Sequence, residues 1–158
     1  MTTHYLEAPA DHLPDPDGPP TVFLAGGITG CPDWQADAAE ELLAADLAVF
    51  NPRRADFPVG DPAEGPRQIA WEHRYLHRAD LTLFWFCAEQ VQPIALLELG
   101  AALGERRAIV VGTDPAYPRR LDVVEQVRLA APAVPVHASL KETLAAAITA
   151  ARPAARPS

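Results

Sequence analysis

The sequence predicts an α/β fold in which a parallel sheet is covered by helices on both faces. Short apolar runs alternate with segments of helical periodicity through five cycles. Gly26, the pair Asn51-Pro52 and Gly112 end three of these runs, as expected for short buried strands. Because parallel strands need long crossovers, the alternation predicts a five-stranded parallel sheet with right-handed connections.

Length and composition predict a single folded domain. The chain has 158 residues and is half apolar, which is enough for one substantial core. Residues 1–20 are rich in proline and acids and lack apolar periodicity, so we expect a flexible N-terminal arm without a catalytic role. The domain is then expected over residues 21–151 and a frayed tail over 152–158.

The first strand is expected over residues 21–25, where an apolar run is cut off by Gly26-Gly27. The helix that follows begins at Asp33 or at Cys31-Pro32, and its apolar positions fall three to four residues apart. The second strand is expected over residues 47–50.

The middle of the chain begins with a predicted loop over residues 53–66, which is long enough to suggest a function. A helix over residues 68–78 then leads into the clearest strand, residues 81–86. Further elements are expected in the order helix 93–104, strand 108–111, helix 121–129 and weak strand 134–136. Ser139 begins the last helix, because Glu142 completes a capping box with it.

Several classes of function are disfavoured. The net charge of −8 argues against a nucleic acid polymer as partner. The sequence contains no apolar run of transmembrane length and no export signal. Cys31 and Cys87 are expected to be reduced thiols in a cytoplasmic protein, and the five histidines form no metal pattern. We therefore expect no metal and no cofactor.

Glu98 is the one charged residue in the apolar run over residues 93–104. Its neighbours three and four positions away are alanines and Ile94, so ionisation is disfavoured unless a partner pairs with it. Glu98 is therefore either a structural acid, paired with Arg74 or Arg78, or a catalytic group.

Open parallel sheets bind ligands outside the carboxyl ends of their strands. The segments that follow those ends are residues 26–30, residues 51–54 and residues 87–89, so we expect them to converge on one cleft. The Gly26-Gly27 turn is either a plain tight turn or a ligand cradle. Arg53 and Arg54 either hold an anion or are solvated.

Two further acids precede the aromatic strand. Asp80, at the junction of helix and strand, is the type of residue that caps a turn, so we favour a structural role for it. Glu72 belongs either to an ordinary polar helix face or to the rim of the cleft.

Seven short motifs over about residues 21–112 together resemble the nucleoside 2-deoxyribosyltransferase-like proteins. In chain order they are Phe23-Leu24-Ala25-Gly26-Gly27-Ile28-Thr29, Cys31-Pro32-Asp33-Trp34-Gln35, Asn51-Pro52-Arg53-Arg54, Trp71-Glu72, Ala79-Asp80, Phe84-Trp85-Phe86 and Leu97-Glu98-Leu99-Gly100. The resemblance implies a flavodoxin-like three-layer sandwich.

It also implies cleavage or transfer at the N-glycosidic bond of a nucleoside or nucleotide. In the characterised transferases and related N-glycosidases a glutamate attacks the sugar carbon that bears the base, and this glutamate matches Glu98. Such an attack gives a covalent sugar ester, and an acid must protonate the departing base. By the resemblance Glu72 is the general acid or a substrate-orienting group.

The resemblance implies that the matched motif residues bind a small-molecule substrate. These residues are Gly26, Gly27, Asp33, Trp34, Asn51, Arg53, Trp71 and Asp80. It also implies a homo-oligomer.

The chain departs from those enzymes at two positions. Phe23 stands where they carry an orienting tyrosine, and Gln92-Pro93 stands where they carry a further acid. A nucleotide-binding or sensing module of the same fold, without turnover, is the alternative.

Overall fold

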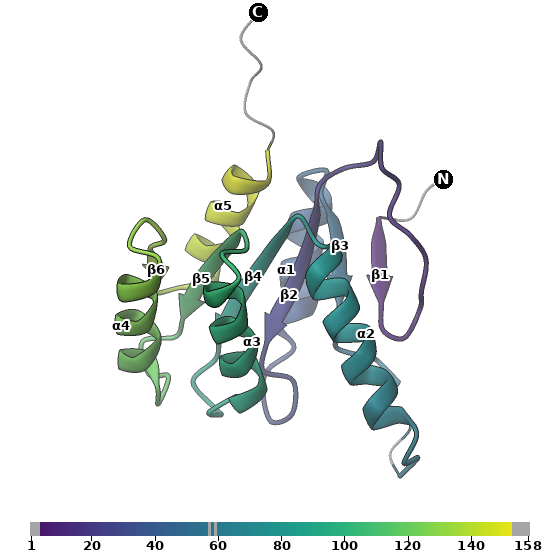
Figure 1. Ribbon diagram of the computed structural model, residues 1–158, viewed down its shortest axis with the longest axis horizontal. Coiled ribbons are helices and arrows are strands. Elements are labelled where there is room, and N and C mark those ends of the chain that lie inside the picture. Colours follow the sequence, from purple (N-terminus) through teal and green to yellow (C-terminus); the bar gives the residue numbers. More distant parts are fainter. Residues whose placement is uncertain (1–3, 57, 59, 153–158) are drawn as a thin grey trace, which may run out of the picture.

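A computed structural model describes residues 4–56, 58 and 60–152. Its centre is a parallel sheet of six strands (Figure 1). The strands are β1 (Tyr5–Glu7), β2 (Thr21–Gly26), β3 (Ala48–Asn51), β4 (Leu81–Phe86), β5 (Ile109–Thr113) and β6 (Val136–His137). The helices are α1 (Trp34–Ala44), α2 (Glu64–Arg78), α3 (Pro93–Gly104), α4 (Arg120–Ala130) and α5 (Leu140–Ala151).

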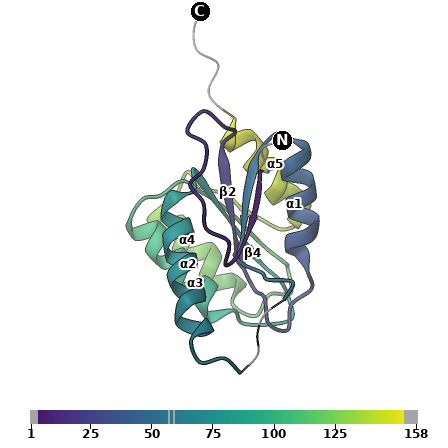
Figure 2. The same cartoon turned by 90° about the vertical axis from the view of Figure 1, so that its right-hand side faces the viewer.

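The helices form two layers on opposite faces of the sheet. Helices α2, α3 and α4 cover one face, and α1 and α5 cover the other (Figure 2). Each face has its own apolar core: Trp71, Tyr75 and Leu99 belong to the first, and Trp34 and Leu42 to the second. The predicted three-layer α/β sandwich is therefore confirmed.

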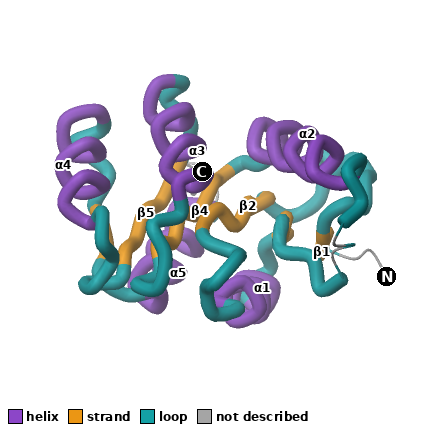
Figure 3. Tube along the Cα trace, turned by 90° about the horizontal axis from the view of Figure 1, so that it is seen from below, coloured by secondary structure: helices purple, strands orange, loops and turns teal. Residues whose placement is uncertain are grey.

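The strand order is β1-β3-β2-β4-β5-β6, with every neighbouring pair parallel. From β2 the chain first moves to β3 on one side, and α2 then carries it back over β2 to β4 on the other. The order therefore reverses between β2 and β4, which is where doubly wound sheets bind their ligands. Figure 3 shows α2 and α3 above this part of the sheet.

Local signals explain where several helices begin. The Asp33 carboxylate accepts a hydrogen bond from the Ala36 amide at 3.2 Å and caps α1. The Ser139 hydroxyl accepts one from the Glu142 amide at 3.1 Å and caps α5, so the predicted cap is confirmed. Proline lies at the first position of α3, where it costs no intrahelical hydrogen bond.

The sheet has six strands and not five, because residues 5–7 form β1 at its edge. This strand lies in the segment that we expected to be a flexible arm without regular structure. It pairs with β3 from Tyr5 opposite Val49 to Glu7 opposite Asn51. Residues 10–12 are then held on α2: Trp71 Nε1 donates to the Ala10 carbonyl at 2.7 Å, and the Tyr75 hydroxyl bonds Asp11.

Helix α2 begins at Glu64, four residues before the predicted start, and so shortens the loop after β3. Glu64 is buried against Arg54, whose guanidinium donates to its carboxylate at 2.7 Å. This pairing holds the first turn of α2 against the loop after β3, and Pro66 lies in that first turn, where proline is tolerated. The expected frayed tail lies outside the described residues, apart from Arg152.

Within the described part of the chain, no helix is both long and apolar enough to cross a membrane.

Candidate active site

A cleft of about 500 Å³ lies at the carboxyl end of β2, between α2 and the start of α3. Its walls come from the end of β2 and the turn after it, from Pro52 after β3, from α2 and from the segment that opens α3. Glu72 on α2 and Glu98 on α3 both line it. Of the segments expected to converge, residues 26–29 and Pro52 line the cleft, whereas after β4 the lining begins at Gln90 and does not include residues 87–89.

The Gly26-Gly27 turn forms one end of the cleft, and its glycines are required by protein contacts. A Cβ atom on Gly26 would lie 2.2 Å from the Trp85 carbonyl oxygen, and one on Gly27 would lie 2.3 Å from Cys31 Sγ. The Gly27 carbonyl accepts hydrogen bonds from Trp34 Nε1 and Gln35 Nε2, both at 3.0 Å. Close packing within the protein, and not approach to a ligand, therefore explains these two glycines.

Gln92 closes the other end of the turn. Its side-chain oxygen accepts from the Gly27 amide at 2.9 Å, and its amide nitrogen donates to the carbonyls of Cys87 and Gln90. The backbone of Gln92 is left-handed, with φ of 59°, an uncommon conformation for a residue other than glycine. A carboxylate here could not donate to these two carbonyls, so the absence of an acid at this position has a structural reason.

Glu98 projects from an otherwise uncharged helix and is partly buried. Among the described residues its carboxylate has no hydrogen-bond or ion-pair partner. Burial, and secondarily the negative charge of Glu72, raises the pKa of Glu98 to about 8, while the Arg107 charge acts in the opposite direction. A carboxyl group that carries a proton near neutral pH is therefore held in the cleft.

The hypothesis that Glu98 is a structural acid paired with Arg74 or Arg78 is wrong. Both arginines pair with Asp11 at 3.4 Å on the outer side of α2. Stacking of Arg78 against the Tyr75 ring, 5.1 Å from its centroid, further holds that side chain in place.

Glu72 lines the same cleft as Glu98, and among the described residues its carboxylate has one hydrogen-bond partner. Gln68, one turn earlier on α2, donates from its amide nitrogen to Glu72 Oε1 at 3.0 Å. Burial raises the pKa of Glu72, and the Gln68 hydrogen bond opposes this rise because it favours the ionised form. Glu72 therefore belongs to the rim of the cleft.

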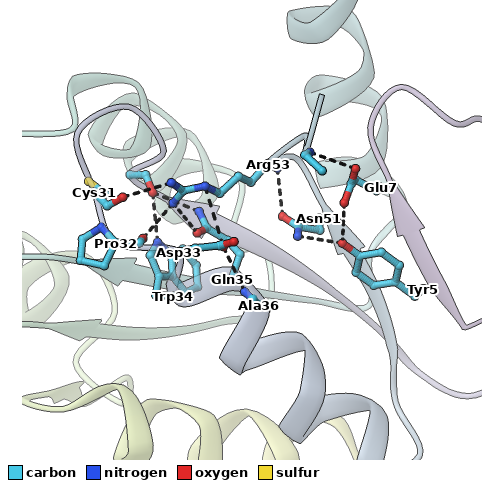
Figure 4. A network of polar contacts seen from close by, with 12 residues as sticks. Tyr5, Glu7, Cys31, Pro32, Asp33, Trp34, Gln35, Ala36, Asn51 and Arg53 are labelled. Carbon is cyan, nitrogen blue, oxygen red and sulfur yellow. Dashed lines mark hydrogen bonds and ion pairs between the residues drawn. The ribbon is translucent and has the colours of Figure 1, made fainter. Parts of the chain in front are cut away.

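Arg53 and its neighbours form a separate polar network beside the cleft (Figure 4). The Arg53 guanidinium donates to the carbonyls of Pro32 and Cys31 at 2.8 and 3.1 Å and to the Gln35 side chain at 3.1 Å. The Asn51 side chain donates to the Tyr5 hydroxyl and accepts from the Arg53 amide. In Figure 4 the Arg53 side chain reaches across to the loop before α1, where Asp33 also lies 3.8 Å from it.

Three more of the predicted site residues, Trp34, Trp71 and Asp80, make structural contacts within the protein. Trp34 is buried under the Gly27 turn, and Trp71 is buried against Phe23 and the N-terminal segment. The Asp80 carboxylate accepts from both the backbone amide and the hydroxyl of Thr21 at 2.9 and 3.1 Å. Asp80 thus joins the start of β2 to the start of β4, which is the structural role that we favoured.

Of the ten predicted site residues, Gly26, Gly27, Glu72 and Glu98 line the cleft. Asp33, Trp34, Asn51, Arg53, Trp71 and Asp80 do not, and direct contact of these six with a substrate stays a prediction. Sequence reasoning missed Gln68 and Gln90, and it singled out Gln92 only as the replacement of an acid. For Gln68 a signal existed, because it lies four residues before Glu72 and so on the same helix face.

Among the described residues, no three His, Cys, Asp or Glu side chains lie close enough together to hold a metal ion. Cys31 and Cys87 are buried behind the Gly27 turn with their sulfurs 2.7 Å apart. Burial raises the pKa of the Cys87 thiol to about 12, which keeps it protonated. The two acids are thus the titratable groups that the cleft itself presents.

Comparison with known proteins identifies the family and the fold. No curated protein matches the chain. The fold is similar to that of a 2-deoxyribosyltransferase from the psychrotolerant bacterium Bacillus psychrosaccharolyticus, with a TM-score of 0.56 and 15% identity over 66% of this chain and 80% of that one. The family described as nucleoside 2-deoxyribosyltransferase like matches residues 19–117, which include the cleft and both of its acids. The chain therefore belongs to the nucleoside 2-deoxyribosyltransferase-like family.

Proposed function

We propose that the protein cleaves or transfers at the N-glycosidic bond of a nucleoside, with Glu98 as nucleophile and Glu72 as general acid. The observation that carries the proposal is the unpartnered Glu98 carboxyl, held in an apolar helix opposite a second acid in one cleft. Family membership supports the reaction class.

The two acids supply the proton that the reaction needs. The pKa of Glu98 is about 8, because of burial and secondarily because of the nearby Glu72 charge. The pair therefore carries one proton near neutral pH. Transfer of this proton from Glu98 to Glu72 leaves Glu98 ionised for attack.

In the chemical step a bond forms between a Glu98 oxygen and the anomeric carbon as the bond from that carbon to the base nitrogen breaks. The electron pair of the broken bond goes to the base, which takes the proton from Glu72. Water or a second base then attacks the sugar ester, releases Glu98 and returns a proton to the pair.

An uncharged nucleoside fits the cleft better than a nucleotide does. Among the residues that the structure describes, the cleft lining contains two carboxyl groups and no lysine or arginine. Of the two arginines expected to hold an anion, Arg53 is bonded to Cys31, Pro32 and Gln35, and Arg54 is bonded to Glu64. A 5′-phosphate would therefore meet two carboxyl groups and no lysine or arginine among the described lining residues.

We further propose that the protein forms a homo-oligomer through the helices around the cleft. Ile69, Ile94 and Leu97 on α2 and α3 are at least 60% exposed, and they surround the cleft mouth or adjoin it on α3. Burial of such side chains against a second copy would remove them from water. Light scattering after size exclusion, on wild type and on Leu97→Lys, tests this: the variant should be monomeric.

A nucleoside-binding module without turnover is the second candidate. Two observations favour it: Phe23 has no hydroxyl, and Gln92 is occupied by three hydrogen bonds within the protein. Such a module would bind nucleosides without releasing base.

The test is a panel of 2′-deoxynucleosides, ribonucleosides and their 5′-monophosphates, each with and without an acceptor base, followed by chromatography. We expect release or exchange of base from nucleosides, and intact-mass spectrometry should reveal a sugar adduct that Glu98→Ala cannot form. Absence of product across the panel, with binding retained in calorimetry, would select the module instead.

A further inference from the structure

Gln68 is placed to control Glu72. The amide nitrogen of Gln68 donates to Glu72 Oε1 at 3.0 Å and to the Pro52 carbonyl at 2.8 Å, so both of its hydrogens are used. The orientation of the amide follows from these contacts, because the reverse orientation would place its oxygen against two acceptors. Gln68 therefore bridges the loop after β3 and the acid on α2.

The oxygen of the same amide has no partner. Gln68 Oε1 is buried and accepts no hydrogen bond from any of the residues that the structure describes. A buried carbonyl left unpaired destabilises the folded state. Packing alone does not account for such a residue, since an apolar side chain of equal length would avoid this cost.

The bridge restricts the Glu72 carboxyl group. With Oε1 engaged by Gln68, the other oxygen remains for exchange of a proton inside the cleft. Few other charged groups act here: Glu98 faces Glu72 from α3, Arg107 acts on Glu98, and the remaining lining residues are uncharged.

We propose that Gln68 is a positioning residue for the general acid: it fixes one oxygen of Glu72 against the Pro52 loop so that the other faces the departing base. The proposal rests on the proposed function. It assigns to Gln68 a role that is exerted through its hydrogen bond to Glu72.

Gln68→Met tests the proposal, because it keeps the length of the side chain and removes both donors together with the unpaired oxygen. Arg67→Met is the matched control: Arg67 is the preceding residue on α2, is exposed and lies outside the cleft lining. The kcat for base release should fall on the order of 10- to 100-fold in Gln68→Met, with little change in KM. Arg67→Met should behave as wild type.

The pH dependence separates positioning from a general loss of structure. The Gln68 hydrogen bond favours ionised Glu72, so its removal should move the acid limb of the kcat/KM profile upward by roughly half a pH unit to one unit. The ¹³C resonance of the Glu72 carboxyl, assigned with Glu72→Gln, should show the same upward shift of its titration midpoint. The melting temperature should stay close to that of Arg67→Met.

An unshifted Glu72 midpoint, or an unchanged kcat and acid limb in an active enzyme, would overturn the role of Gln68 and leave the proposed function standing. Absence of base release by the wild type would overturn the proposed function, and the catalytic role of Gln68 with it. The NMR titration needs no turnover, so it still reports whether Gln68 sets the protonation of Glu72.

Discussion

Two polar regions lie at the carboxyl end of the sheet, and they differ in how completely their groups are satisfied. In the network around Arg53 and Asn51, both side chains hydrogen-bond to protein partners (Figure 4). In the cleft, the Glu98 carboxyl and the Gln68 oxygen have no recorded partner among the described residues. Groups satisfied within the protein support the fold, whereas buried groups left unsatisfied indicate where a ligand acts.

The sharpest test of this comparison is Glu98→Gln, which removes the nucleophile with little change in shape. We expect kcat for base release to fall by at least about a thousandfold. The free energy of unfolding should not fall, because Glu98 has no partner to lose. Chromatography of the products and urea titration measure the two effects, and retention of turnover would refute the assignment.

Glu72→Gln should have the next largest effect, a fall in kcat of about a hundredfold from the loss of the general acid. The Glu72 charge raises the pKa of Glu98, so this variant should also lower that pKa. The ¹³C resonance of the Glu98 carboxyl reports the change. A titration midpoint that stays near 8 would mean that the two acids do not interact.

Arg53→Met should have the opposite effect to Glu98→Gln: it should lower stability more than activity. It removes hydrogen bonds to Cys31, Pro32 and Gln35, so we expect unfolding to become about 2 kcal/mol easier. Arg128→Met, which removes an exposed ion pair with Glu125, is the control and should leave the free energy of unfolding nearly unchanged. Should Arg53→Met instead abolish activity at unchanged stability, Arg53 would be a substrate-binding residue after all.

The last test of the comparison is a pH dependence of stability, which concerns Glu98 alone. Glu98 has a pKa of about 8 in the folded protein, whereas an exposed glutamate has a pKa of 4.5, so between these two pH values only the unfolded chain loses the proton. Unfolding then releases a proton, and stability falls as pH rises from about 5 to 8. Urea titrations at pH 5, 6.5 and 8 should show a weaker dependence in Glu98→Gln than in wild type.

The sequence predicted the elements whose apolar contrast is strongest. Helix α3 and strand β4 match their predicted ranges, and Glu98 is conspicuous because it alone is charged in α3. Strand β1 was missed because three residues beside a proline-rich stretch carry almost no periodicity, and their pairing with β3 is a long-range contact.

The sequence could not predict which polar side chains are hydrogen-bonded within the protein. Whether Arg53 is free or occupied depends on carbonyls of Cys31 and Pro32, which the fold brings to it from another loop. Likewise the bridge from Gln68 to Pro52 exists only once α2 has crossed the sheet. Such contacts follow from tertiary structure and leave no mark in local spacing.

The N-terminal segment bears on where the folded unit begins. The family match starts at residue 19, yet β1 covers the outer edge of β3, and the polar atoms of Trp71 and Tyr75 are bonded to residues 10–12. A protein shortened to the matched region would expose the edge of β3 to pairing between molecules. Such a shortened protein would therefore tend to aggregate, even though it keeps every described residue of the cleft lining.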